Sequence, residues 1–225
     1  MLKAFSRIAV VALLCSASSQ AIARSAEWIV SESKGPVSIV RQSGRVAAAR
    51  GTPVGAGDAV VTGAGGSAVL VRDKDFVTVA ANSRVRIPQG QQVSTMTRFL
   101  QDVGNAIFRI EKRGTPHFAV DTPYLAAVVK GTTFSITVGA DSTSLQVTEG
   151  VVEVATKDGG ARDLVRPGSI AMIAAGDRYR LSISGDQPAI IDSPQRAAEM
   201  PSSPGDAAVA PATAAKPAEI GRAHV

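Results

Sequence analysis

The sequence of 225 residues is poor in the side chains that build metal and redox sites, with one cysteine and two histidines. The cysteine, Cys15, lies in an apolar N-terminal segment that we expect to be removed. The mature chain would then form neither a disulfide nor a thiolate metal site. His117 has no metal-binding partner near it in the sequence, so we interpret it as a structural or surface residue. His224 lies near the C-terminus.

A strong excess of one charge is also missing, and only nine aromatic residues occur. The formal net charge is +5 and falls to +3 (5 − 2) when Lys3 and Arg7 are removed with the N-terminal segment. The basic residues are scattered, whereas single-stranded nucleic acid is bound by basic grooves with stacking aromatics. We therefore expect no nucleic-acid partner.

A matched set of acid, base and nucleophile is absent as well. Residues 121–123, Asp-Thr-Pro, lack the glycine of an aspartic-protease loop, and Asp73 and Asp75 lack further calcium ligands at loop spacing. The glycines at 55–57 precede a strand pattern, not the helix that a phosphate loop requires. Glu149 would need a second carboxylate for catalysis. We expect no enzyme activity, no cofactor and no metal site.

Long apolar runs are confined to the N-terminus. Lys3 and Arg7 precede the apolar run 8–14, and Ala21-Ile22-Ala23 forms a small-residue cleavage site. This pattern predicts a signal peptide over residues 1–23 and a periplasmic product, with a retained anchor as the alternative. Leu14 stands where a lipoprotein signal has a small residue, so lipidation of Cys15 is not expected. No other run approaches the length of a membrane span.

The chain is rich in short runs that alternate apolar and polar residues between glycine-containing turns. Such runs predict an all-β domain over residues 27–185, either a sandwich or a solenoid-like stack of coils. No capped amphipathic helix of three turns is present, which argues against an α/β sheet. Trp28 is expected to pack at the edge of the core. Residues 89–103 fit a polar loop followed by a strand or a short helical turn.

The composition changes from Asp186 onward. Six of the twelve prolines lie in residues 186–225, among alanine, serine and glycine. Such a segment buries too little apolar surface to offset the entropy of ordering. We therefore predict a disordered tail, which either acts as a flexible extension or contacts partners or the cell wall.

The stretch 118–136 organises the predicted domain. Pro123 ends a first alternating run, Gly131 provides a corner, and a second run follows. We expect four side chains of this stretch to lie on one buried face: Phe118, Val120, Phe134 and Ile136. The pattern contains no chemistry of its own and indicates a folding element.

Five sequence pieces, in the same order, resemble the FecR domain, a periplasmic domain of Gram-negative bacteria. They are Gly57–Gly63, Ala81–Ile87, Phe-x-Val-x-Thr-Pro at 118–123, Lys-Gly-Thr-x-Phe at 130–134, and Glu-Gly-Val-Val-Glu-Val at 149–154. The resemblance spans about residues 28 to 175. It implies that the following motif positions are structural or form a contact: Phe118, Val120, Thr122, Pro123, Gly131, Thr132, Phe134, Glu149 and Gly150.

In the best-known architecture of that family, a cytoplasmic segment restrains a sigma factor, and the periplasmic domain receives a signal from an outer-membrane receptor. Here an export signal stands at the N-terminus, so we expect a stand-alone secreted form. The resemblance implies a noncatalytic module for protein–protein contact or envelope signalling, with an unidentified envelope protein as partner and exposed strand edges as the contact. The alternative is a structural scaffold of the envelope with a wall-associated tail. The sequence does not indicate an oligomeric state.

Overall fold

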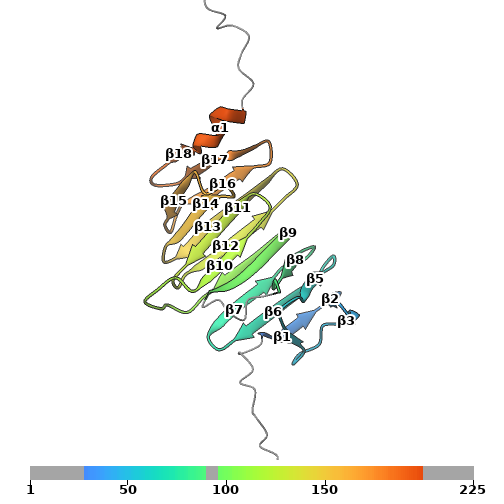
Figure 1. Ribbon diagram of the computed structural model, residues 1–225. Coiled ribbons are helices and arrows are strands. Elements are labelled where there is room, and N and C mark those ends of the chain that lie inside the picture. The colour runs from blue at the N-terminus through green and yellow to red at the C-terminus, as the bar shows by residue number, and fades with distance from the viewer. Residues whose placement is uncertain (1–27, 90–95, 200–225) are drawn as a thin grey trace, which may run out of the picture.

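The computed structural model describes residues 28–89 and 96–199. The predicted signal peptide and the part of the predicted tail from residue 200 onward lie outside these residues. The described part is built almost entirely of strands, which follow one another along the long axis of the molecule (Figure 1). The predicted all-β fold is therefore confirmed. In the described ranges, no helix is long and apolar enough to cross a membrane.

The strands form two hydrogen-bonded layers, which we name sheet A and sheet B. Sheet A contains, in spatial order, β4 (Pro53–Val54), β1 (Trp28–Lys34), β6 (Ser67–Arg72), β7 (Asp75–Val79), the second half of β9 (Thr97–Arg109), β12 (Thr133–Val138), β13 (Ser142–Glu149), β16 (Ile170–Ala174), β17 (Asp177–Ser184) and β18 (Ala189–Asp192).

Sheet B contains β3 (Gly44–Ala47), β2 (Val37–Arg41), β5 (Ala59–Thr62), β8 (Arg84–Arg86), the first half of β9, β10 (Phe118–Asp121), β11 (Leu125–Val129), β14 (Val152–Thr156) and β15 (Arg162–Val165). From β10 onward, antiparallel hairpins alternate between the sheets: β10–β11 and β14–β15 in sheet B, β12–β13 and β16–β17 in sheet A.

Strand β9 belongs to both layers. Its first half pairs with β8 and β10, and its second half pairs with β7 and β12. The change occurs at Gly104, whose φ is +88° and whose Cβ position would be filled by Ser83. Glycine is thus required where the strand bends and another backbone comes close. Residues 89–103 therefore end in a strand, one of the two predicted alternatives, although residues 90–95 lie outside the described part.

The two layers face each other across an aromatic core. The Trp28 ring, from sheet A, meets the Phe99 ring, from the sheet B half of β9, edge to face at 5.0 Å. Phe108 and Phe118 lie 6.0 Å apart across the layers, and Phe108 stacks on Phe134 at 5.1 Å. All five rings are buried. Trp28 packs inside the core, slightly deeper than predicted.

The arrangement contains features of both predicted architectures. Two facing layers make it a sandwich. One solenoid-like coil is present as well, because the chain leaves β9 in sheet A, crosses to sheet B, and runs as β10 parallel to the first half of β9. The parallel register pairs Phe118 with Thr97 and Asp121 with Leu100.

The prediction that Phe118, Val120, Phe134 and Ile136 share one buried face is half correct. All four side chains are buried. The first two belong to sheet B and the last two to sheet A, so they point at each other from opposite layers. The chain crosses between layers at Gly131, and sequence alternation does not record such a crossing.

The predicted start of disorder at Asp186 is wrong for residues 186–199. This part contains β18, which pairs with β17, and the helix α1 (Pro194–Glu199). Proline content suggested disorder here, but Pro188 and Pro194 flank the strand instead of interrupting it. Pro194 occupies the first turn of α1, where its missing N–H costs nothing. The Ser193 hydroxyl accepts the Gln195 N–H at 3.2 Å and so caps the helix.

Candidate functional site

The family-like motif residues are mostly structural. Phe118, Val120 and Phe134 lie in the core. The buried Thr122 hydroxyl accepts the Leu125 N–H at 2.9 Å and donates to the Leu125 carbonyl at 2.9 Å, which closes the turn between β10 and β11. Pro123 lies exposed at the tip of this turn. These residues hold the hairpin together.

The second group of motif residues supports a close backbone contact. Gly150 has a φ of +84°, and a Cβ atom there would meet Thr132 at 2.7 Å. Thr132 is buried, and its carbonyl accepts the Ile110 N–H at 2.9 Å. Glu149 is exposed and pairs in register with Thr133. The motif is therefore not gathered into one polar site.

His117 is a buried structural residue, one of the two predicted possibilities. Its ring Nδ1 lies 3.2 Å from the Thr115 carbonyl, an arrangement in which Nδ1 carries the proton. Its backbone joins β9 and β11, because the His117 carbonyl accepts the Thr97 N–H and its N–H donates to the Val129 carbonyl.

Carboxylates do not gather into a metal site in the part of the chain that the structure describes, where no group of three or more His, Cys, Asp or Glu residues could hold an ion. Asp75 follows the hairpin turn between β6 and β7, and its side chain is buried. It accepts the Glu111 N–H at 2.9 Å and pairs with Arg72 at 3.4 Å. It therefore ties the β6–β7 turn to the end of β9.

The outer face of sheet B carries charged side chains in pairs. Arg86 binds Asp102 through two hydrogen bonds of 2.7 Å. Asp121 accepts from Lys157 Nζ at 2.9 Å and from Arg98. Burial raises the pKa of the Asp121 carboxyl, but the two hydrogen bonds and the positive charges of Lys157 and Arg98 together lower it by more, so its pKa lies below the ordinary value.

The outer face of sheet A differs because its centre carries no charge. Two rows of outward-facing side chains cross the sheet there, and we call them together the neutral band. The first row is Val69, Thr78, Ile107, Ser135, Gln146, Ile170 and Ser184. The second row is Asn105, Thr137, Ser144, Met172, Ser182 and Ile190.

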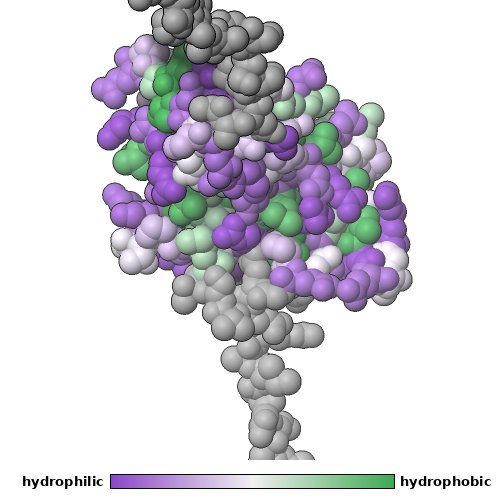
Figure 2. All heavy atoms as spheres, turned by 45° about the horizontal axis from the view of Figure 1, so that its top comes forward, coloured by the Kyte–Doolittle hydropathy of each residue, from purple (hydrophilic) through white to green (hydrophobic). Residues whose placement is uncertain are grey.

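The neutral band contains much of the exposed apolar surface. Ile107, Ile170, Met172 and Ile190 are all exposed. Ile29 and Phe76, also exposed, adjoin the band through Val71 on the neighbouring strands. Figure 2 shows apolar side chains as green patches between hydrophilic ones on the surface in view. Absence of charge is typical of the core of a protein–protein interface, and exposed apolar side chains that lie close together mark interaction sites.

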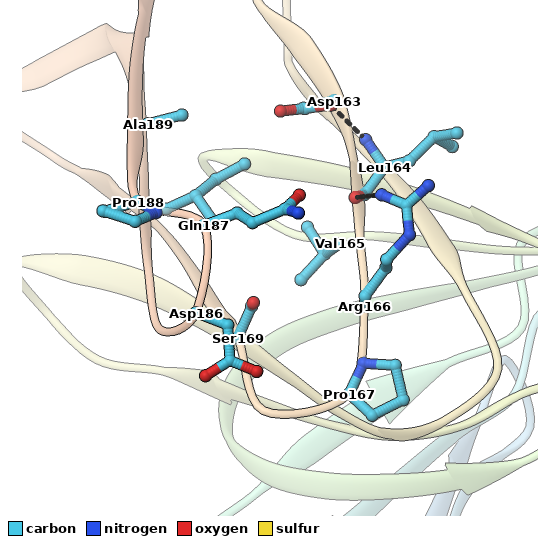
Figure 3. A pocket seen from close by; sticks show the side chains of 11 residues that line it. Asp163, Leu164, Val165, Arg166, Pro167, Ser169, Asp186, Gln187, Pro188 and Ala189 are labelled. Atoms are coloured by element: carbon cyan, nitrogen blue, oxygen red, sulfur yellow. Dashed lines mark hydrogen bonds between the residues drawn. The ribbon is translucent and has the colours of Figure 1, made fainter.

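A groove of about 300 Å³ lies at the far end of the sandwich, between β15 and the loop that joins β17 to β18 (Figure 3). The edge of β15 faces this groove. The backbone groups of Leu164 on this strand are already occupied, because the Leu164 N–H donates to Asp163 Oδ1 at 2.7 Å and Arg166 Nη1 lies 3.5 Å from the Leu164 carbonyl. Side chains that occupy edge groups protect a strand from pairing. This edge is a weaker candidate contact than the neutral band.

Sequence analysis missed the neutral band. The signal was present as serine, threonine and glutamine on the polar side of several strands. The band itself depends on which strands are neighbours in sheet A, and this order is set by the tertiary fold.

One family model and two solved structures are similar to this chain. A family model described as FecR protein matches residues 58–153. Two crystal structures of a protein described as a candidate anti-sigma factor from Parabacteroides distasonis ATCC 8503 are similar, at 2.50 and 1.65 Å resolution. Each has 17% identity and a TM-score of 0.49, with 57% of this chain covered.

This chain spans 60% of the length of those two structures. A search of curated proteins found no match. The match of the family model includes the motifs at 118–123, 130–134 and most of 149–154, on which the sequence resemblance depends. The resemblance is therefore confirmed, because the FecR family model matches residues 58–153 of this chain.

Proposed function

We propose that this protein is a noncatalytic module of the bacterial envelope that works by protein–protein contact in signalling, with the neutral band of sheet A as its contact surface. The family match supports a regulatory role rather than an enzymatic one. The observation that carries the proposal is the contrast between the two outer faces. The centre of the sheet A face is neutral and partly apolar, whereas the sheet B face carries paired charges.

The partner surface is expected to be neutral as well. A charged group of the partner placed against Ile107 or Ile170 would lose its hydrating water and find no counter-charge. This desolvation costs free energy of binding. A strongly acidic or basic partner would fit sheet B better. The band therefore favours a partner with aliphatic and hydroxyl side chains of its own.

Affinity capture from envelope extracts tests this proposal. The full chain is compared with Ile107→Asp in the neutral band and with Leu164→Asp on the outer face of sheet B. Leu164→Asp is the matched control, since the Leu164 side chain is 48% exposed and the Ile107 side chain is 45% exposed. We expect Ile107→Asp to lose the captured protein and Leu164→Asp to keep it.

The opposite pattern would contradict the proposal. A chain shortened after residue 199 distinguishes the proposed contact module from the alternative, an envelope scaffold with a wall-associated tail. The shortened chain keeps β18 and α1 but lacks the rest of the proline-rich tail. Capture that depends on the tail and is indifferent to Ile107→Asp would favour a wall-associated scaffold.

A further inference from the structure

Apart from Val69 at its β6 end, the first row of the neutral band has the same character when read from either end. Across six neighbouring strands it runs Thr78, Ile107, Ser135, Gln146, Ile170, Ser184. A hydroxyl stands at each end, an isoleucine comes next on each side, and two polar residues meet in the middle. The midpoint lies between Ser135 on β12 and Gln146 on β13.

We propose that the partner of the neutral band is a second copy of this chain, bound in a two-fold dimer whose axis runs along the strands between β12 and β13. This inference rests on the proposed function, because it names the partner of the same face. Under that symmetry, Ile107 of each copy meets Ile170 of the other. The contact between Ile107 and Ile170 then occurs twice, once on each side of the axis, as in every isologous interface. Ser135 meets Gln146, and Thr78 meets Ser184.

The chemistry of the row fits this pairing. The two Ile107–Ile170 contacts bury apolar side chains that are exposed in the single chain. The polar pairs between them can hydrogen-bond across the interface, and the row brings no like charges together. In the second row, the central residues Thr137 and Ser144 also face each other across the same axis. The face is thus complementary to itself along six residues of the first row and at the centre of the second row.

The size of the face sets the expected strength. Six strands spaced ~4.8 Å apart and about five residues long cover roughly 500 Å² per copy, or about 1,000 Å² in total, near the lower limit for a specific interface. We therefore expect a dimer that dissociates in the micromolar range.

Sedimentation equilibrium on the full chain, purified after expression with its own N-terminal segment, tests the proposal. At about 100 µM, well above the micromolar dissociation expected for so small an interface, the wild-type protein should have the mass of two copies. Ile107→Asp alone and Ile170→Lys alone should each be monomeric. An equimolar mixture of the two should recover the dimer, because the introduced aspartate then faces the introduced lysine at one contact and two isoleucines remain at the other. Leu164→Asp should behave as wild type.

A wild-type protein that is monomeric at this concentration overturns the dimer. So do single variants that dimerise like wild type, or a mixture that stays monomeric. If the wild type is monomeric while Ile107→Asp still loses a captured envelope protein, the dimer is wrong and the proposed function stands. If neither assay responds to Ile107→Asp, both proposals are wrong.

Discussion

The backbone of Gly131 lies directly against the backbone of Lys112. A Cβ atom on Gly131 would stand 2.1 Å from the Lys112 Cα and 2.6 Å from its amide nitrogen, and Gly131 has a φ of +149°. The contact is continued by the Arg113 N–H, which donates to the Lys130 carbonyl at 2.8 Å. This contact holds together the two chain segments that pass between the sheets. One segment joins β9 to β10, and the other joins β11 to β12.

Replacing this glycine should therefore damage the fold. We expect Gly131→Val to lower the free energy of unfolding by about 3–5 kcal/mol, because a branched side chain meets both a forbidden φ and a neighbouring backbone. Gly114→Val is the control, since no atom lies within 4 Å of its Cβ position. Urea melts of both variants measure the effect. Equal midpoints for the two would show that the backbone contact is not needed.

The aromatic core predicts a second result. Phe134 is fully buried and stacks on Phe108, so Phe134→Ala should cost ~3–5 kcal/mol, the usual range for a core phenylalanine. Phe76→Ala is the matched control, because that ring is 39% exposed on the outer face of sheet A. Thermal melts followed by circular dichroism compare the two. A control that loses as much stability as Phe134→Ala would argue against the buried stack.

The turn at Thr122 offers a third test. Its hydroxyl makes hydrogen bonds to the N–H and the carbonyl of Leu125 inside the protein. Thr122→Val keeps the shape but removes both bonds, so we expect a loss of about 1–3 kcal/mol. Thr122→Ser should retain most of the stability, because it keeps the hydroxyl. Chemical denaturation of the pair checks this, and identical losses would mean that the methyl group matters instead.

Acid should weaken the protein through Asp121. The pKa of Asp121 is lowered in the folded state, so its contribution is present above the unfolded value near 4 and is lost as the pH falls through the lower folded value. Both cationic partners are half-exposed, so the contribution is about 1 kcal/mol. We expect Asp121→Asn to be less stable at pH 7 and to lose less stability below pH 4 than wild type. Urea midpoints between pH 7 and pH 2 measure this, and parallel curves would contradict it.

Much of the fold could be predicted from the sequence. Alternation located β10, β12 and most other strands, and it identified Phe118 and Phe134 as core residues. Glycine and proline located the corners at Gly131 and Pro123. These features depend on local chemistry, namely the period of two in a strand and the backbone freedom of particular residues.

The rest of the fold depends on contacts between distant segments. Nothing local indicates that β9 bends at Gly104 and changes sheets there, because the bend depends on the approach of Ser83. The parallel pairing of Phe118 with Thr97 is likewise set by how the chain crosses between layers. The candidate site has the same origin, since Ile107 and Ile170 are more than sixty residues apart and share a row only through β12 and β13.

The most direct test of the central claim, that the outer face of sheet A is the contact surface, is photo-crosslinking in living cells. A photoreactive residue replaces Gln146 in the middle of the neutral band or, as the control, Glu153 on the outer face of sheet B. Both positions are exposed and lie on paired strands. We predict a crosslinked protein adduct from position 146 and none from position 153. Adducts from position 153 alone, or equally from both positions, would contradict the account.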